Sequence, residues 1–345
     1  MRLFAIFLLL LLAAPCGAAL EAGGPIQQRA TPAISRVFGS APPMTLLAYV
    51  LNSDTLIAVN APLKNSANNA EPRFLSPRFL QLPVLGGWQG DHQPNLEEIL
   101  LAHPELIVIW DTPLLSDRVA ADLQKINIPA VKVNIDRTES YPQVFRMLGE
   151  VLGKKDRGEQ LARYAEEELR QLQAFTASIP PAKLVRVYYA EGQDGLRTDC
   201  EHSFHAEPIT FAGGENVQHC TQSTVMGMVS VNFEQILQYN PEVIIAQEQE
   251  FMRAITQDDK WRNLAAVKKK RVYLVPKTPF NWLDRPPSLM RILGAHWLAA
   301  VLYPDQYPYD LRAKTAAFFT LFFGVTLSGE ELDQYFAAPS GLSAR

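Results

Sequence analysis

Short apolar runs alternate with helix-period patterns along the chain from about residue 44 onward. The run "LIVIWD" at 106–111 is continuously apolar until its end, which is typical of a strand buried on both faces. "TLIAVN" at 55–60 and "AVKVN" at 130–134 predict two more strands, and "DRVAADLQKIN" at 117–127 has the spacing of a helix. Strands that alternate with helices indicate an α/β fold with mainly parallel sheets.

One phrase of this pattern occurs twice. "NLEEILLAHPELIVIWD" (95–111) returns 137 residues later as "NFEQILQYNPEVIIAQE" (232–248), with seven of the 17 positions identical. In each copy an Asn caps a helix, a Glu lies in the first turn, a Pro follows the helix and a buried strand comes next. Two copies predict two Rossmann-like lobes of similar construction.

A long helix is expected between the lobes, over 154–179. Its apolar residues recur at steps of three or four until Pro180 and Pro181, and about 25 helical residues span roughly 37 Å. A crossover helix within one domain is the alternative, but the new strand "VRVYYAEG" that follows favours a bridge with a ligand cleft between the lobes. The aromatic segment "AKTAAFFTLFFGV" is expected to be a core helix packed on the second lobe. The predicted divisions are a signal peptide at 1–19, a loosely held leader at 20–43, a first lobe at 44–153, the bridging helix at 154–179 and a second lobe at 180–345.

The N-terminus predicts export. Arg2 is followed by an apolar run of about 11 to 13 residues and then by small residues, a pattern typical of a cleaved secretory signal peptide and too short for a membrane span. Cleavage after Ala19 is expected. A lipoprotein acylated at Cys16 is the alternative, and Pro15 argues against it because that processing needs a small residue there. A net charge of −4 and a pI near 5.9 provide no basic field for nucleic acid.

Several features together resemble one family: the duplicated phrase, the long helix, the export signal and the segments "TPFNWLDRPPSLMRILGAHWLAAVLYP" and "FFTLFFGVTLSGEEL". It is the helix-bridged periplasmic substrate-binding proteins of ABC importers, which deliver iron siderophores, cobalamin, haem and related metal chelates. The resemblance implies a periplasmic protein without an intrinsic cofactor, whose partners are a small-molecule chelate and a permease dimer in the inner membrane. It also implies that Glu97 and Glu234 pair with Arg residues of the permease. Stabilisation of each helix N-terminus by these carboxylates is the local alternative.

Ligand residues are expected on loops at the carboxyl ends of the sheet strands, where α/β folds bind ligands. Aromatic side chains there offer flat faces, and arginines can pair with an anion. The aromatic candidates are Trp88, Trp110, Phe280 and Trp282, and the arginine candidates are Arg73, Arg78, Arg197 and Arg285. The loop "NWLDRPP" at 281–287 is the strongest candidate, although Asp284 could satisfy Arg285 locally.

The segment "TDCEHSFHAEPITFAGGENVQHC" at 198–220 holds the densest chemistry. Cys200 and Cys220 are the two cysteines left after the signal peptide, and in an oxidising compartment a disulfide between them is expected, closing a loop of about 20 residues. A zinc site of both cysteines with His219 and His202 or His205 is a second interpretation, although its spacing matches no standard motif. A third keeps the disulfide and lets one His complete the coordination of an incoming metal, with His92 as the counterpart in the first lobe. The metal-binding candidates are His92, His202 and His205.

These observations predict a binding protein for an iron siderophore or similar transition-metal chelate, with iron or nickel as the metal. Cobalamin or haem is the nearest alternative, since the Trp residues would serve either. An exported enzyme is a different class of function, and the chain has no HExxH, GxSxG, GxxxxGK[ST] or CxxC motif to support it. Asp111 and Glu248 could act as an acid–base pair, but the duplication already explains their matched positions. A nitrogenase-like metallocluster scaffold shares this architecture, and the chain lacks the cluster cysteines. A stiff bridging helix predicts little lobe movement.

Overall fold

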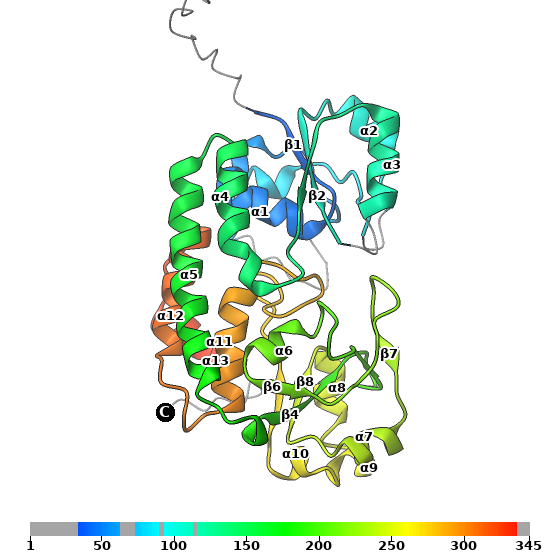
Figure 1. Cartoon of the computed structure of the whole chain (residues 1–345), viewed down its shortest axis with the longest axis vertical. Coiled ribbons are helices and arrows are strands. Elements are labelled where there is room, and N and C mark those ends of the chain that lie inside the picture. The colour runs from blue at the N-terminus through cyan, green and yellow to red at the C-terminus, as the bar shows by residue number, and fades with distance from the viewer. Residues whose placement is uncertain (1–33, 63–72, 90–92, 113–115, 337–345) are drawn as a thin grey trace, which may run out of the picture. The chain divides into compact units, whose positions relative to one another are not determined.

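Two parallel β-sheets organise the chain (Figure 1). The structure is a computed structural model that describes residues 34–62, 73–89, 93–112 and 116–336. The first sheet has the order β1 (Val37–Gly39), β2 (Leu106–Trp110), β3 (Ala130–Val133), and both of its pairings are parallel. All five residues of β2 are buried, so the strand is covered on both faces, as its continuous apolar sequence predicts.

The second sheet has the order β6-β4-β8-β9, again with every pairing parallel. Its strands are β4 (Val185–Ala190), β6 (Gly214–Asn216), β8 (Val243–Ala246) and β9 (Val272–Leu274). A short antiparallel pair is formed by β5 (Arg197–Thr198) and β7 (Val229–Ser230), which lie in the connections between the strands of this sheet. The predicted α/β class with mainly parallel sheets is confirmed.

Helices cover both sheets. We call the first sheet and its helices the N lobe, and the second sheet and its helices the C lobe. The N-lobe helices are α1 (Pro42–Asn52), α2 (Leu96–Leu101), α3 (Ser116–Ile126) and α4 (Tyr141–Val151). The C-lobe helices are α6 (Glu207–Phe211), α7 (Phe233–Tyr239), α8 (Gln249–Ala254), α9 (Asp259–Arg262), α10 (Ala265–Lys268) and α11 (Arg291–Leu302).

The long helix expected over 154–179 is present as α5 (Lys155–Ala177). It packs closely on α4, and two glycines permit the approach. A Cβ at Gly149 would lie 2.8 Å from the Cα of Gly158, and a Cβ at Gly158 would lie 2.5 Å from the carbonyl oxygen of Phe145. Larger residues at these positions would force the two helices apart.

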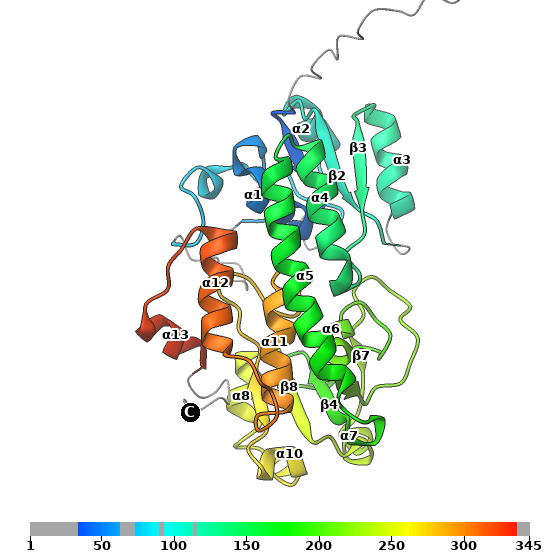
Figure 2. The ribbon, with the colours of Figure 1, turned by 60° about the vertical axis from the view of Figure 1, so that its left-hand side comes forward.

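The C-terminal helices are α12 (Leu311–Phe323) and α13 (Gly329–Phe336), and α12 contacts more of the chain than expected. The aromatic face of α12 packs on the bridging helix and the N lobe, and both views place α12 beside α5 (Figures 1 and 2). Tyr164 of α5 contacts Phe318, whereas Phe74 of the N lobe contacts Phe319 at a ring distance of 5.2 Å. Phe319 also contacts Trp282 of the second lobe at a ring distance of 6.4 Å, so the predicted packing on that lobe is present. The contacts with α5 and the N lobe were not predicted, because an aromatic helical pattern shows that a face is buried but not against which partners.

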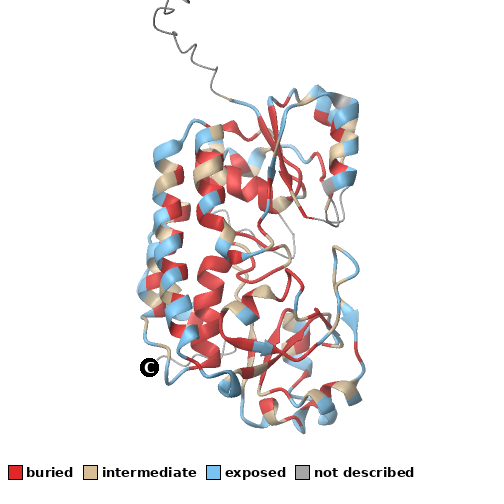
Figure 3. Cartoon of the chain, in the orientation of Figure 1, coloured by how far each residue is buried: buried red, intermediate tan, exposed pale blue. Residues whose placement is uncertain are grey.

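Two boundaries also differ from the sequence-based expectations. The leader predicted at 20–43 contains β1, whose residues are fully buried and pair with β2, so the N lobe begins before residue 44. Residues 55–60 form only isolated bridges, of Leu56 with Val37 and of Val59 with Val84, rather than a strand. Buried residues follow α5, α11 and the inner strands through both lobes (Figure 3). Among the described residues, no helix is long and apolar enough to cross a membrane.

Candidate ligand-binding site

Charged side chains converge at the carboxyl end of β4 in the C lobe. Glu191 directly follows β4 and Asp199 directly follows β5, and both side chains are fully buried. The guanidinium of Arg285 bridges them, with Nε donating to Glu191 Oε1 at 2.6 Å and Nη2 donating to Asp199 Oδ2. Its Nη1 donates to the carbonyl of Met226 at 2.7 Å, so the side chain of Arg285 is only 16% exposed. Three separate loops are thereby held together at the edge of the sheet where α/β folds bind ligands.

A second layer lies beneath this arginine. His205 is buried and its Nδ1 lies 2.6 Å from Asp284 Oδ2, while its Nε2 lies 2.6 Å from the carbonyl oxygen of Val225. Asp284 also lies 3.3 Å from Arg291, which is fully buried and donates from Nε to the carbonyl of Leu283 at 2.7 Å. The two layers form one network, which we call the Arg285 cluster and which consists of Glu191, Asp199, His205, Asp284, Arg285 and Arg291.

Burial and neighbouring charges set the protonation of this cluster. Burial raises the pKa of Glu191 well above its usual value, and the positive charge of Arg285 only partly opposes this. Burial also acts to raise the pKa of Asp284, but His205 and Arg285 outweigh it and the net pKa lies below the usual value. Burial acts to lower the pKa of Arg285, and the surrounding carboxylates raise it above its ordinary value, so this arginine stays charged. The cluster therefore holds an ion pair of Arg285 next to a carboxyl group that favours its neutral form.

Asp199, His205 and Asp284 could in principle hold a metal ion, because one ligand atom from each lies within 4.8 Å of the others. The guanidinium of Arg285 already binds Asp199, and its Nε lies 3.3 Å from Asp284 Oδ2. A cation inserted between these carboxylates would have to displace an arginine that is itself a cation. The described arrangement thus satisfies the acidic groups internally and does not present a ready metal site.

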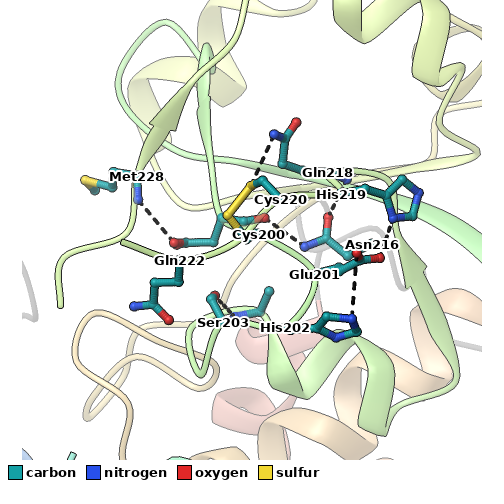
Figure 4. Close-up of a disulfide and its surroundings, with 12 residues drawn as sticks. Cys200, Glu201, His202, Ser203, Asn216, Gln218, His219, Cys220, Gln222 and Met228 are labelled. Carbon is teal, nitrogen blue, oxygen red and sulfur yellow. Dashed lines mark hydrogen bonds and ion pairs between the residues drawn. A yellow bond between two sulfur atoms is a disulfide. The ribbon is translucent and has the colours of Figure 1, made fainter. Parts of the chain in front are cut away.

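The predicted disulfide between Cys200 and Cys220 is present (Figure 4). Both sulfur atoms are consumed by this bond, so the alternative zinc site is wrong. His219 contacts the carboxylate of Glu201, and His202 is 89% exposed with its Nε2 3.7 Å from the same residue. Neither His202 nor His219 points to the Arg285 cluster, whereas His205 is part of it. His92 lies outside the described residues.

The three predicted tryptophans have no free face. The indole of Trp88 is 3% exposed and donates to Asp122 at 3.0 Å, and that of Trp110 is 1% exposed and donates to Asp136 at 2.8 Å. Trp282 is fully buried and stacks on Tyr335. The expectation that these rings offer flat surfaces to a ligand does not match their burial, since each is part of a hydrophobic core. Phe280 is half-buried and contacts Phe323.

The other predicted arginines are dispersed. Arg78 donates to the carbonyls of Ser53 and Leu56, both at 2.9 Å, and therefore fastens a loop of the N lobe. Arg73 pairs with Glu331 and donates to the carbonyl of Thr326, so it fastens the C-terminal segment. Arg197 is exposed, and its side chain has no hydrogen bond or ion pair with any described residue. Of the four arginines, the structure brings only Arg285 into the cluster, and Arg197 lies on the neighbouring strand β5.

Glu97 and Glu234 are both exposed in the first turns of α2 and α7. The caps are made by other residues: Asn95 accepts hydrogen bonds from the backbone of Glu97 and Glu98, and Asn232 forms a capping box with Gln235. The two glutamate side chains themselves make no hydrogen bond or ion pair with the residues that the structure describes. Local capping thus does not require either carboxylate.

Sequence reasoning missed Glu191 and Asp199, the two buried partners of Arg285. A carboxylate at the carboxyl end of a strand, as in "YYAEG", is the one signal that could have suggested Glu191. Nothing in the sequence shows that a residue 94 positions later fills the space between these carboxylates.

Comparisons with known proteins agree with this architecture. The sequence model of a family described as periplasmic binding protein matches residues 64–279. The solved structure of an ABC transporter solute binding protein from Sulfurospirillum deleyianum is 53% identical, with a TM-score of 0.87 over 89% of this chain and 95% of that one. The molybdate-binding protein of Haemophilus influenzae is 26% identical over 235 residues, which cover 62% of this chain and 65% of that protein, just under two thirds of its length. The vitamin B12-binding protein of Pectobacterium atrosepticum is 28% identical over 215 residues, 61% of this chain and 70% of that protein.

Proposed function

Because this chain belongs to the periplasmic binding protein family, we propose that it captures a small, metal-containing anionic solute and delivers it to the permease of an ABC importer. The observation that carries the proposal is the Arg285 cluster. Its ion pairs and hydrogen bonds hold several loops in fixed positions at the carboxyl end of the C-lobe sheet, where α/β folds bind ligands. The proteins with which it shares this family are named as solute-binding proteins rather than enzymes.

Within this class we propose a transition-metal chelate, such as an iron siderophore, as the ligand. A relative named for vitamin B12 supports a chelate, because cobalamin is a metal held by an organic ligand. Exposed Arg197 on β5, whose side chain is not paired with any described residue, supplies positive charge for an acidic chelate.

A metal oxyanion such as molybdate is the second candidate, and one observation favours it. Trp88, Trp110 and Trp282 are all buried, so they provide no aromatic platform of the kind that a large planar ligand uses. A small tetrahedral anion needs only hydrogen-bond donors and positive charge. The relative named for molybdate is consistent with this choice.

Isothermal titration calorimetry of the purified protein tests both candidates. The panel comprises ferric catecholate and hydroxamate siderophores, nickel with and without histidine, cobalamin, haem, molybdate and tungstate, with sulfate and phosphate as controls. Saturable binding of one chelate with a Kd of about 1 μM or tighter, a binding free energy near −8 kcal/mol, supports the first proposal. Binding of molybdate and tungstate alone would replace it with the oxyanion. A folded protein that binds none of the panel would refute both ligand classes.

A further inference from the structure

The duplicated phrase offers an internal comparison between the two lobes. Seven positions are identical in the copies at 95–111 and 232–248, and five of them have a structural reason in both lobes. The Asn caps its helix, the first Ile is fully buried below it, the Pro is buried and the second Ile is buried in the strand. The second Glu accepts a hydrogen bond from the backbone at the start of the neighbouring strand, from Arg36 just before β1 in one lobe and from Arg186 within β4 in the other. These pairs are Asn95 and Asn232, Ile99 and Ile236, Pro104 and Pro241, Glu105 and Glu242, and Ile107 and Ile244.

The two remaining identities make no hydrogen bond and no buried contact of this kind with the described residues, although a first-turn carboxylate also stabilises its helix through the dipole. One is the pair Glu97 and Glu234, and the other is the pair Leu100 and Leu237. Leu100 is 42% exposed and Leu237 is 46% exposed, and Leu101 next to the former is 76% exposed. Leucine in the open at matched positions costs hydration free energy in both lobes and contributes little to either core.

The exposed leucines lie beside the exposed carboxylates. Leu100 and Leu101 follow Glu97 by three and four residues on α2, and Leu237 follows Glu234 by three residues on α7. Residues three and four apart share one face of a helix, so each lobe presents a carboxylate next to an apolar side chain. We call Glu97, Leu100 and Leu101 the N-lobe patch, and Glu234 and Leu237 the C-lobe patch.

The family resemblance already implies that Glu97 and Glu234 meet the permease. We propose that Leu100, Leu101 and Leu237 act as apolar anchors in the same contact; this rests on the proposed function. A surface that is repeated in one chain fits a partner that presents the same site twice, as a two-fold symmetric dimer does. Charge complementarity defines the rest of that site: each half of the permease offers a basic side chain next to a shallow apolar depression. The carboxylates steer and orient the encounter, and the leucines slow dissociation.

The chain contains its own matched control. The residue in the C-lobe patch that corresponds to Leu101 is Gln238, which is exposed and polar. Leu101→Gln makes the N lobe resemble the C lobe, and Gln238→Leu makes the C lobe resemble the N lobe. Surface exchanges of this kind leave the unfolding temperature nearly unchanged, which checks that each variant is folded.

The test is biolayer interferometry of the purified protein on its cognate permease dimer in lipid nanodiscs, at low and high salt. Leu101→Gln and Leu237→Gln are each expected to weaken binding about five- to tenfold, mainly by faster dissociation and equally at both salt concentrations. Gln238→Leu is expected to tighten binding several-fold, and Gln238→Ser to leave it unchanged. Glu97→Gln and Glu234→Gln should slow association, with an effect that shrinks at high salt.

Each alternative outcome gives a different answer. If the wild-type protein binds the permease and both leucine variants bind equally well, the apolar anchors are wrong and the proposed function stands. If the wild-type protein does not bind the permease, the proposed function fails and the anchors with it. If analytical ultracentrifugation shows that the wild-type protein self-associates through these leucines, the patches belong to a contact with a second copy and the inference is overturned.

Discussion

Replacement of Arg285 by glutamine tests whether this residue holds the C lobe together. Its guanidinium is the partner of two fully buried carboxyl groups, Glu191 and Asp199, and also binds the carbonyl of Met226. Removing one partner of a buried ion pair leaves an uncompensated charge and typically costs about 3–5 kcal/mol. Because the raised pKa of Glu191 already favours its neutral form, removing Arg285 leaves little uncompensated charge on this residue and the loss is reduced. We therefore expect a loss near the lower end, about 3 kcal/mol, which corresponds to a decrease in Tm of roughly 4–5 °C for a chain of this length.

Urea denaturation followed by circular dichroism measures this loss, with Asp199→Asn as the companion variant. The double variant Arg285→Gln/Asp199→Asn should be more stable than Arg285→Gln alone, because it removes the carboxylate that would otherwise be left unpaired. If Arg285→Gln unfolds like the wild-type protein but no longer binds its ligand, the arginine serves the ligand and our structural account of the cluster is refuted.

Three further predictions concern the same lobe and its connections. For Glu191→Gln, we expect a flatter pH dependence of stability above pH ~4.5. The folded wild-type protein keeps a proton on Glu191 that the unfolded chain has released, so its unfolding free energy falls as the pH rises toward the raised pKa. An unchanged slope in pH-dependent urea titrations would contradict this. Replacement of Cys200 and Cys220 by serine should lower the unfolding free energy by about 3 kcal/mol, because the disulfide closes a loop with a sequence separation of 20. Thermal unfolding with and without a reductant measures this loss. Equal Tm values would mean that other contacts hold the loop. Small-angle X-ray scattering with saturating ligand should show only a small change in the radius of gyration, and a large compaction would show that the lobes close as a hinge.

Local elements of the fold could be predicted well from the sequence. The caps at Asn95 and Asn232, the buried strand at 106–110 and the helix at 155–177 each follow from a period or a capping residue that acts within one turn or strand. Strand β1 was missed because three residues at the end of a Pro- and Gly-rich segment provide too short a period to detect. Packing of α12 on the second lobe was predicted, but its contacts with α5 and the N lobe were missed because amphipathic patterns reveal a buried face without identifying what covers it.

The candidate site was predictable only in part. Cysteine count and compartment sufficed for the disulfide, and the loop with Arg285 and Asp284 was identified from its composition. The tryptophans were misplaced because an indole in a loop sequence can pack inward as easily as outward, and Trp88 and Trp110 each find a carboxylate for the indole N–H inside the protein. Buried charges such as Glu191 depend on contacts across 94 residues of sequence, and no local pattern encodes them.

The connections between the lobes affect how the protein can meet its permease. Besides α5, the C-terminal segment ties the N lobe to the rest of the chain, through the ring contact of Phe145 with Phe322 at 5.7 Å and a hydrogen bond of 3.0 Å from Arg73 to the carbonyl oxygen of Thr326. A hinge motion would have to separate these aromatic contacts and expose them to water, whereas small shifts preserve them. Two patches carried by a stiff body can engage both halves of a symmetric dimer without a further loss of conformational entropy, since the second contact forms within a complex that the first has already made. The same rigidity keeps the two contacts independent, so their free energies should add, and a double substitution with one change in each patch should weaken binding by about the product of the two single effects.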